Sequence, residues 1–383
     1  MGAPEIVPAW VRTTSALRQV AEQLARSREI AIDTEGDSLH HYPARLSLIQ
    51  IADGGGTAWL VDPLAIDDLS ALAPVFGDPA ILAVLHAGDN DLVHLKRRYG
   101  FTFGAIFDTS LAARFLGARA LGLDVLLREY LGVELPPSRQ KDDWSVRPLT
   151  EAQERYAAAD VLHLLALKDR LVEPLRAAGR LHWVEEECAA LAAEEVAERP
   201  ADPDAFFRLK GARDLTLRQV GILRALWQLR ERLARSADRP PFKVLGDATL
   251  VALAVAAPRT VADLGKIPGC TPRVVGRWGQ AMLEAIARAQ ALPESELPVA
   301  PRPPRLPSVP GPVRRRIELL RQWRTDAAPA TGLESGVVLP NRLMRPIAEA
   351  APRDLEALSR VEGIRRWRVE SFGPQILAAM RAT

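Results

Sequence analysis

Glu29-Ile-Ala-Ile-Asp-Thr-Glu35 is a short apolar run that ends in two carboxylates one residue apart. An apolar run of this length is typical of a buried β-strand, and residues one apart on a strand point to the same side. Asp33 and Glu35 should therefore project together from the end of a strand. Carboxylates placed in this way offer the oxygen ligands that hard divalent cations prefer.

Further strand and helix signals follow this segment over the first 190 residues. Strand-like runs lie at 45–51, 57–62 and 81–86, and helix-like runs lie at about 89–99, 108–117, 121–131 and 150–178. A glycine turn at 53–56 favours an antiparallel meander of the first three strands. This alternation predicts the α/β class, with a mixed sheet and covering helices.

Beyond residue 200 the pattern is helical and contains an internal repeat. Residues 257–259, 264, 267, 269, 279 and 282–283 recur at 351–353, 358, 361, 363, 373 and 376–377, a constant offset of 94. Such a constant offset predicts tandem all-α domains, at 210–291 and 313–383. Between them, the segment 293–312 holds eight prolines, so we expect 292–312 to be a semi-rigid extended linker.

The net charge of the 383-residue chain is only +2, but the charge is unevenly distributed. From residue 301 onward there are 15 Arg and 8 acidic residues, a balance of +7, which leaves −5 for the first 300 residues. A basic tail behind an acidic body fits a nucleic-acid handle. A solvated arginine-rich surface would give the same pattern.

Composition also narrows the class of protein. No apolar run is long enough to span a membrane, and the first residues lack the pattern of a signal peptide. The two cysteines do not suggest a disulfide framework, and no P-loop pattern occurs. We therefore expect a cytoplasmic monomer that neither enters membranes nor uses ATP.

Two further acidic positions complete a candidate metal site. Tyr156 and Asp160 are four apart on a predicted helix and share one face. After the strand at 81–86, either Asp89 or Asp91 could supply another carboxylate on spacing alone, although Asp89 reads as a helix N-cap. Carboxylates that hold two divalent ions about 3.5–4 Å apart are suited to phosphodiester cleavage.

Taken together, these segments resemble a known family. Asp33-Thr-Glu35, His86–Leu92 and Tyr156–Val161 look like the three motifs of the DEDDy 3′→5′ exonucleases. Asp142–Leu149 is similar to the segment before the third motif in the ribonuclease D family, and the tandem helical copies resemble HRDC (helicase and ribonuclease D C-terminal) domains. The resemblance to the ribonuclease D family extends over nearly the whole chain.

The resemblance implies a ribonuclease H-like exonuclease domain at 1–195, followed by the two all-α HRDC domains and the linker between them. It implies two Mg²⁺ or Mn²⁺ ions, held by Asp33, Glu35, Asp91 and Asp160, with Tyr156 positioning the attacking water. It further implies removal of single nucleotides from RNA with a free 3′ end, with release of nucleoside 5′-monophosphates. Precursor tRNA and other small structured RNAs would be the substrates.

Other residues are candidates for substrate contact. The candidates near the site are Thr34, His86, Trp144 and Arg147. His86 could instead pack in the core, and Trp144 and Arg147 could instead brace the loop before the last helix. The candidates for the RNA handle are Arg314, Arg315, Arg316, Arg365, Arg366, Trp367 and Arg368, where guanidinium groups stand beside an aromatic ring.

Two other functions remain open from the sequence. A DNA 3′→5′ exonuclease of the proofreading or repair type would use the same carboxylates. A non-catalytic nucleic-acid-binding protein could have the same fold, but it would have little reason to keep every carboxylate. The pair of HRDC-like domains favours RNA over DNA.

Overall fold

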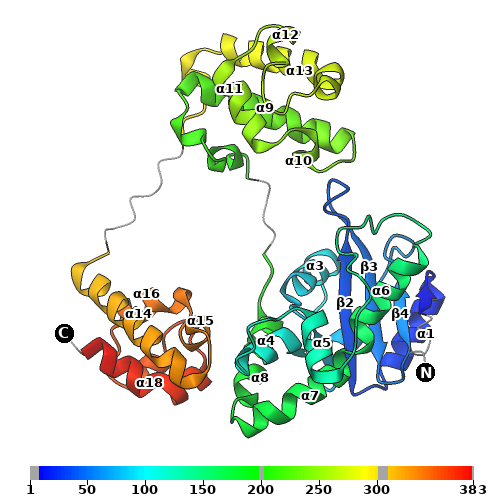
Figure 1. Ribbon diagram of the computed structural model, residues 1–383, viewed down its shortest axis with the longest axis vertical. Helices are drawn as coiled ribbons and strands as arrows, with labels where there is room; N and C mark the ends of the chain where they lie inside the picture. The colour runs from blue at the N-terminus through cyan, green and yellow to red at the C-terminus, as the bar shows by residue number, and fades with distance from the viewer. Residues whose placement is uncertain (1–7, 198–201, 301–308, 382–383) are drawn as a thin grey trace. The chain divides into compact units, whose positions relative to one another are not determined.

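The computed structural model describes residues 8–197, 202–300 and 309–381. The chain divides into two compact units. One contains most of the first 197 residues together with the C-terminal helical domain, and the other contains the middle helical domain together with Gly36–Arg45. Figure 1 shows the strands gathered in the N-terminal part and helices alone after residue 202.

In the described part of the chain, six strands form one mixed sheet in the order β1-β4-β3-β2-β5-β6. The strands are β1 (Ala9–Val11), β2 (Glu29–Gly36), β3 (Leu46–Asp53), β4 (Ala58–Val61), β5 (Leu82–Leu85) and β6 (Ala105–Asp108). β3 and β4 are antiparallel, whereas β1 with β4, β2 with β5, and β5 with β6 are parallel. The predicted mixed sheet is confirmed. The two outermost strands, β1 and β6, were not predicted.

The helices of the N-terminal part include those predicted at 89–99, 108–117 and 121–131, whereas the helices before residue 80 and after residue 180 were not predicted. The helices are α1 (Thr14–Leu24), α2 (Ala73–Gly77), α3 (Asp89–Tyr99), α4 (Thr109–Phe115), α5 (Leu123–Leu131), α6 (Glu151–Leu162), α7 (Leu164–Ala177) and α8 (Leu181–Ala193), with a 3₁₀ turn, η1, at Ser70–Leu72. The single helix predicted at 150–178 is broken at His163. Asp108 caps α4, its carboxylate accepting a hydrogen bond from the Leu111 amide at 2.9 Å.

One helix brings the third motif to the sheet. The capping box of Thr150 and Gln153 fixes the start of α6, which packs on β3 and β4. Leu48 and Leu60 point toward α6, while their strand neighbours pack in the main core on the opposite face. The alternation along these strands thus holds α6 against the sheet, and with it Tyr156 and Asp160.

The two helical domains are structural copies. The first contains α9 (Leu217–Ser236), α10 (Pro241–Val244), α11 (Asp247–Ala256), α12 (Val261–Leu264) and α13 (Pro272–Ala291), with 3₁₀ turns η2 (Ala205–Arg208), η3 (Ala212–Asp214) and η4 (Glu294–Glu296) around it. The second contains α14 (Gly311–Thr331), α15 (Ser335–Val338), α16 (Asn341–Ala350), α17 (Leu355–Ser359) and α18 (Arg366–Arg381).

Individual hydrogen bonds and helix ends in the two domains are also related by the offset of 94 residues. Arg230 donates to the Leu245 carbonyl and to Asp247, and Arg324 donates to the carbonyl and side chain at the two equivalent positions. Ala257 and Ala351 both end a helix in the left-handed conformation, each with φ 44°. Conserved bonds and caps at one spacing confirm the predicted repeat. Of the predicted linker, residues 301–308 lie outside the described residues.

Within the first unit, α18 of the C-terminal domain packs on α8. The Trp183 and Trp367 rings stack with centroids 4.4 Å apart. Glu187 accepts from Arg365 Nε at 3.1 Å and from Arg368 Nη2 at 3.3 Å. Glu186 accepts from two backbone amides at the start of α18 and so caps that helix.

These contacts correct part of the predicted RNA handle. Trp367 and Arg368 are 0% and 1% exposed, and Arg368 also donates to the Val337 and Val338 carbonyls. Neither side chain is available to stack on a base or to hold a phosphate. The side chains of Arg365, Trp367 and Arg368 instead pack the C-terminal domain against α8. Arginine suits this role because its guanidinium group can donate to buried carboxylate and carbonyl acceptors.

The other handle residues differ in exposure. Arg314 and Arg315 are exposed, and Arg316 donates to the Ala348 carbonyl at 3.0 Å. Arg366 is exposed and pairs with Glu370. Among the described residues, no helix is long and apolar enough to cross a membrane.

Candidate active site

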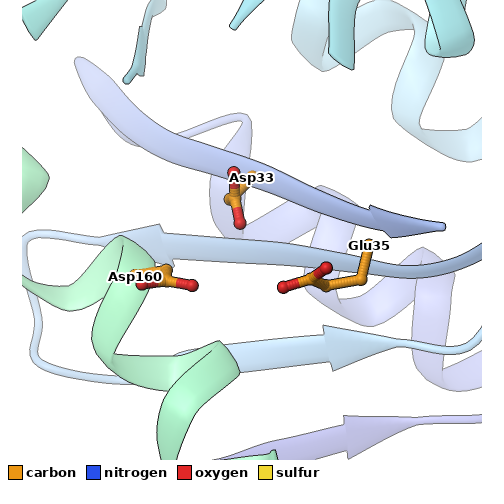
Figure 2. A group of neighbouring side chains, drawn as sticks. All are labelled: Asp33, Glu35 and Asp160. Carbon is orange, nitrogen blue, oxygen red and sulfur yellow. The ribbon is translucent and has the colours of Figure 1, made fainter. Parts of the chain in front are cut away.

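Three carboxylates from two elements converge at the end of β2. Asp33 and Glu35 extend from that strand, and Asp160 extends from α6 toward them (Figure 2). One oxygen of each lies within 4.8 Å of the others. Because all the donors are carboxylate oxygens, the cluster fits a hard divalent cation such as Mg²⁺ or Mn²⁺. Nitrogen and sulfur ligands do not take part in this group.

Asp91 adds a fourth carboxylate beside the cluster. It lies in the first turn of α3, lines the same pocket, and accepts a hydrogen bond from the Thr34 hydroxyl. Asp89 does not line the pocket, and the residue at the N-cap of α3 is Gly88, so the interpretation of Asp89 as the N-cap was wrong. The geometry thus favours Asp91 over Asp89 as a fourth ligand.

Tyr156 lies one helical turn before Asp160 and lines the pocket with it. Its hydroxyl hydrogen-bonds to the Asp160 carboxylate, while its ring packs 6.0 Å from the Trp144 ring. Burial and the neighbouring carboxylates raise the pKa of Tyr156 above its usual value. The hydroxyl therefore stays protonated at neutral pH, and it can orient a water molecule but cannot act as a general base.

Burial raises the pKa of every acid in the cluster, and the charges of the neighbouring acids add to this effect for Asp33 and Glu35. Burial, followed by the charges of Asp160 and Asp91, raises the pKa of Glu35 to about 9. Burial raises the pKa of Asp160 to about 7 and also raises those of Asp33 and Asp91. Carboxylates held this close favour protonation unless a cation compensates their charge. A divalent cation bound to this site would supply that compensation.

These shifts predict how the stability of the metal-free protein depends on pH. The pKa values of Glu35 and Asp160 are raised above their ordinary values of 4.5 and 3.8, so the folded state binds protons more tightly than the unfolded state. The resulting stabilisation is complete below these ordinary values and is lost as the pH rises through about 7 and about 9. In the presence of a chelator, we expect the Tm to fall by about 5 °C or more as the pH rises from 4.5 to about 9.

Differential scanning fluorimetry checks this expectation. Glu35→Gln should flatten the decline and raise the Tm at alkaline pH, while Glu22→Gln on the exposed face of α1 should behave as the wild type does. Added Mg²⁺ should raise the Tm of the wild type more than that of Glu35→Gln. A wild-type Tm that climbs steadily over the same interval would contradict the description of the cluster.

The carboxylates open into a pocket of about 860 Å³. Thr34 and His86 line it, and the His86 Nδ1 lies 2.9 Å from the Thr109 hydroxyl. Arg114 on α4 and Arg128 on α5 also line the pocket. The sequence did not single out these two arginines, because each stands alone on its helix without a motif around it. They place positive charge where an anionic substrate would lie.

The two candidates in the loop before α6 have structural roles. Trp144 is 0% exposed and is buried among Leu48, Leu60 and the Tyr156 ring, so it is not available to stack on a base. Arg147 forms two hydrogen bonds with Asp62, at 2.7 and 3.0 Å, and donates to backbone carbonyls. Substrate contact was the wrong alternative for Trp144; both residues brace the loop that supports Tyr156.

Comparison with known proteins places this geometry in a class. A family model described as 3′–5′ exonuclease matches residues 8–176, and an HRDC domain model matches 219–286 and 313–380. The chain is 34% identical to ribonuclease D of Pseudomonas paraeruginosa over 391 residues, covering 99% of each. It is also 34% identical to ribonuclease D of Escherichia coli, over 75% of this chain and 76% of that one.

Two solved structures have a fold similar to that of this chain. Escherichia coli RNase D, an exoribonuclease involved in structured RNA processing, superimposes with a TM-score of 0.69 at 29% identity, covering 98% of this chain and 99% of that one. A protein from Bifidobacterium adolescentis gives a TM-score of 0.80 at 26% identity, covering 98% and 97%. The fold is thus an exonuclease domain with a mixed sheet followed by helical HRDC domains, which defines a hydrolytic 3′–5′ exonuclease.

Within that class, the chain belongs to the ribonuclease D family. It is a 3′–5′ exoribonuclease, its substrate is RNA, and its acidic cluster suits the divalent metal that this exonuclease family uses.

Proposed function

We propose that this enzyme trims the 3′ ends of precursor tRNA and other small structured RNAs by two-metal-ion hydrolysis, releasing nucleoside 5′-monophosphates. The convergence of Asp33, Glu35 and Asp160 within 4.8 Å carries the proposal. The similarity to an Escherichia coli exoribonuclease of structured RNA supports the substrate class.

In this proposal Asp33, Glu35, Asp91 and Asp160 hold two Mg²⁺ or Mn²⁺ ions. When bound, the ions neutralise the phosphate and make a water molecule nucleophilic near pH 7. The Tyr156 hydroxyl accepts a hydrogen bond from that water while Asp160 holds the tyrosine in place. Arg114 and Arg128 attract the phosphates of the terminal nucleotides into the pocket.

We further propose that the exonuclease domain spans 1–195, the HRDC domains span 210–291 and 313–383, and 292–312 links them. The enzyme would act as a cytoplasmic monomer. Cys188 and Cys270, the two cysteines of the chain, are both free and buried, which fits a reducing compartment.

A comparison of substrates tests the proposal. A tRNA precursor with a short 3′ trailer should lose the trailer one nucleotide at a time in Mg²⁺, while a DNA hairpin with the same sequence and overhang should remain largely intact. Equal or faster loss from DNA would favour a repair-type exonuclease. Binding of RNA without release from any substrate would favour a non-catalytic protein.

A further inference from the structure

The first HRDC domain has a groove between α9 and α13 that no motif predicted. Its volume is about 190 Å³. Small side chains form its floor, namely Gly221, Ala225, Ala285 and Ala289. Longer polar side chains form its rim, namely Arg224, Gln228 and Arg232 from α9 and Arg288 from α13. The α9 residues are spaced four apart, so they line one face of the helix.

The positive charge of this groove is largely uncompensated. Neither Arg224 nor Arg232 forms an ion pair with any residue in the described part of the chain; Arg224 donates only to the Glu296 carbonyl, at 3.1 Å. Arg288 lies 3.8 Å from Glu284, but both side chains are more than half exposed, so this pair is weak. Among the described residues, the three guanidinium groups that line the groove thus have one carboxylate within ion-pair distance, that of Glu284.

The helix ends near the groove do not offset this charge. The C-terminal carbonyls of α13 would add partial negative charge, which anions avoid. Arg218 covers them by donating to the carbonyls of Ala289, Gln290 and Leu292. The Arg218 guanidinium therefore compensates the partial negative charge of this helix end.

The second HRDC domain shows that the fold does not require these arginines. At the offset of 94, Arg224 corresponds to Glu318 and Arg232 to Asp326, while the glutamine between them is kept as Gln322. In that copy Glu318 pairs with Arg321 at 3.3 Å, and Asp326 accepts from Gln322. The same helix pair thus carries acids in one copy and arginines in the other.

We propose that the α9–α13 groove of the first HRDC domain binds the phosphodiester backbone of the RNA substrate, whereas the second copy serves to pack against α8. The inference rests on the proposed function and identifies which copy holds the RNA. Guanidinium groups bind phosphate in a bidentate fashion, and a floor of small residues lets a backbone approach closely. Binding through phosphates is independent of base sequence, as a 3′-trimming enzyme with several substrates requires.

The full-length double variant Arg224→Glu with Arg232→Asp tests the groove, because it installs the acids that the second copy tolerates. The matched control is Arg259→Glu with Arg273→Glu, two exposed arginines of the same domain outside the groove with the same change in charge. Binding of a 5′-fluorescein-labelled RNA hairpin with a single-stranded 3′ extension is followed by anisotropy in EDTA, so that no cleavage occurs.

We expect the groove variant to raise the Kd about tenfold or more at about 50 mM salt. Loss of two phosphate contacts should also reduce the slope of log Kd against log salt by about 1.4. The control pair should change the Kd by less than about threefold, the effect of net charge alone.

Equal weakening by both pairs, or an unchanged Kd in the groove variant, would overturn the proposal. A Tm measurement and the rate of dinucleotide hydrolysis in Mg²⁺ show whether each variant is folded. If the groove variant is unfolded, the milder Arg224→Gln with Arg232→Gln is read by the same criteria. Failure of the proposed function would appear separately, as a wild type that binds the hairpin but releases no nucleotide in Mg²⁺.

Discussion

Asp160→Asn should reduce kcat on RNA by about 10³-fold or more and leave RNA binding nearly unchanged. The Asp160 carboxylate is 8% exposed and has an oxygen within 4.8 Å of Asp33 and Glu35. Asparagine keeps the shape but removes the charge that a divalent ion needs, and its amide oxygen can still accept a hydrogen bond from the Tyr156 hydroxyl. Multiple-turnover hydrolysis of a 5′-labelled RNA in Mg²⁺ measures kcat, and anisotropy in EDTA measures binding.

The control for this variant lies on the same helix. Glu151 is an exposed acid in the first turn of α6 that pairs with Arg155. Glu151→Gln should retain wild-type kcat. If Asp160→Asn keeps more than about a tenth of the wild-type kcat, Asp160 is not a metal ligand.

Tyr156→Phe should lower kcat by about 10²-fold with little change in the Kd for RNA or in the Mg²⁺ concentration for half-maximal rate. The substitution removes only the hydroxyl, because the phenyl ring can keep its packing against Trp144 and Leu48. Metal binding then persists without a group to orient the water. Since the pKa of Tyr156 is raised, the wild-type rate should show no loss from tyrosine ionisation below pH 9 or so.

Tyr130→Phe on α5 provides the matched control, because Tyr130 is half-buried and does not line the pocket. It should have wild-type kcat. A kcat for Tyr156→Phe within about twofold of the wild type would show that the hydroxyl does not position the water.

The placement of the candidate site residues could be predicted from the sequence because it depends on local geometry. A period of two places Asp33 and Glu35 on one side of β2, and a period near four places Tyr156 and Asp160 on one face of α6. The bounds of α3 were predicted as 89–99 and observed at Asp89–Tyr99. The choice between Asp89 and Asp91 depended on the family resemblance, since spacing along one helix turn does not show which side faces a distant strand.

The burial of individual side chains by tertiary contacts could not be predicted from the sequence in the same way. Trp144, Trp367 and Arg368 have the side chains that RNA-binding surfaces use, yet each is buried. Arg368 donates to Glu187 and to two backbone carbonyls, and these acceptors come from segments remote in sequence. The groove of Arg224, Arg232 and Arg288 escaped notice for the same reason, because two helices far apart in the chain form it.

Comparison of the two HRDC copies shows which arginines are free to bind RNA and which are used within the protein. The uneven distribution of arginine pointed to the last 83 residues as the RNA handle. In the structure, part of that charge is used within the protein, where Arg365 and Arg368 pair with Glu187. In the first copy, which belongs to the net acidic part of the sequence, two arginines of the groove have no ion pair among the described residues. Local arrangement, and not net charge, therefore identifies the candidate RNA surface.

The most direct test of the central claim is to follow product release from one RNA carrying a different label at each end. In Mg²⁺ or Mn²⁺ we predict that the 3′-terminal label is released first and as a nucleoside 5′-monophosphate, that the 5′-labelled remainder shortens stepwise, and that EDTA stops both. Release of the 5′ label first, internal cleavage, or full activity in EDTA would contradict the account of a metal-dependent 3′→5′ exoribonuclease at Asp33, Glu35, Asp91 and Asp160.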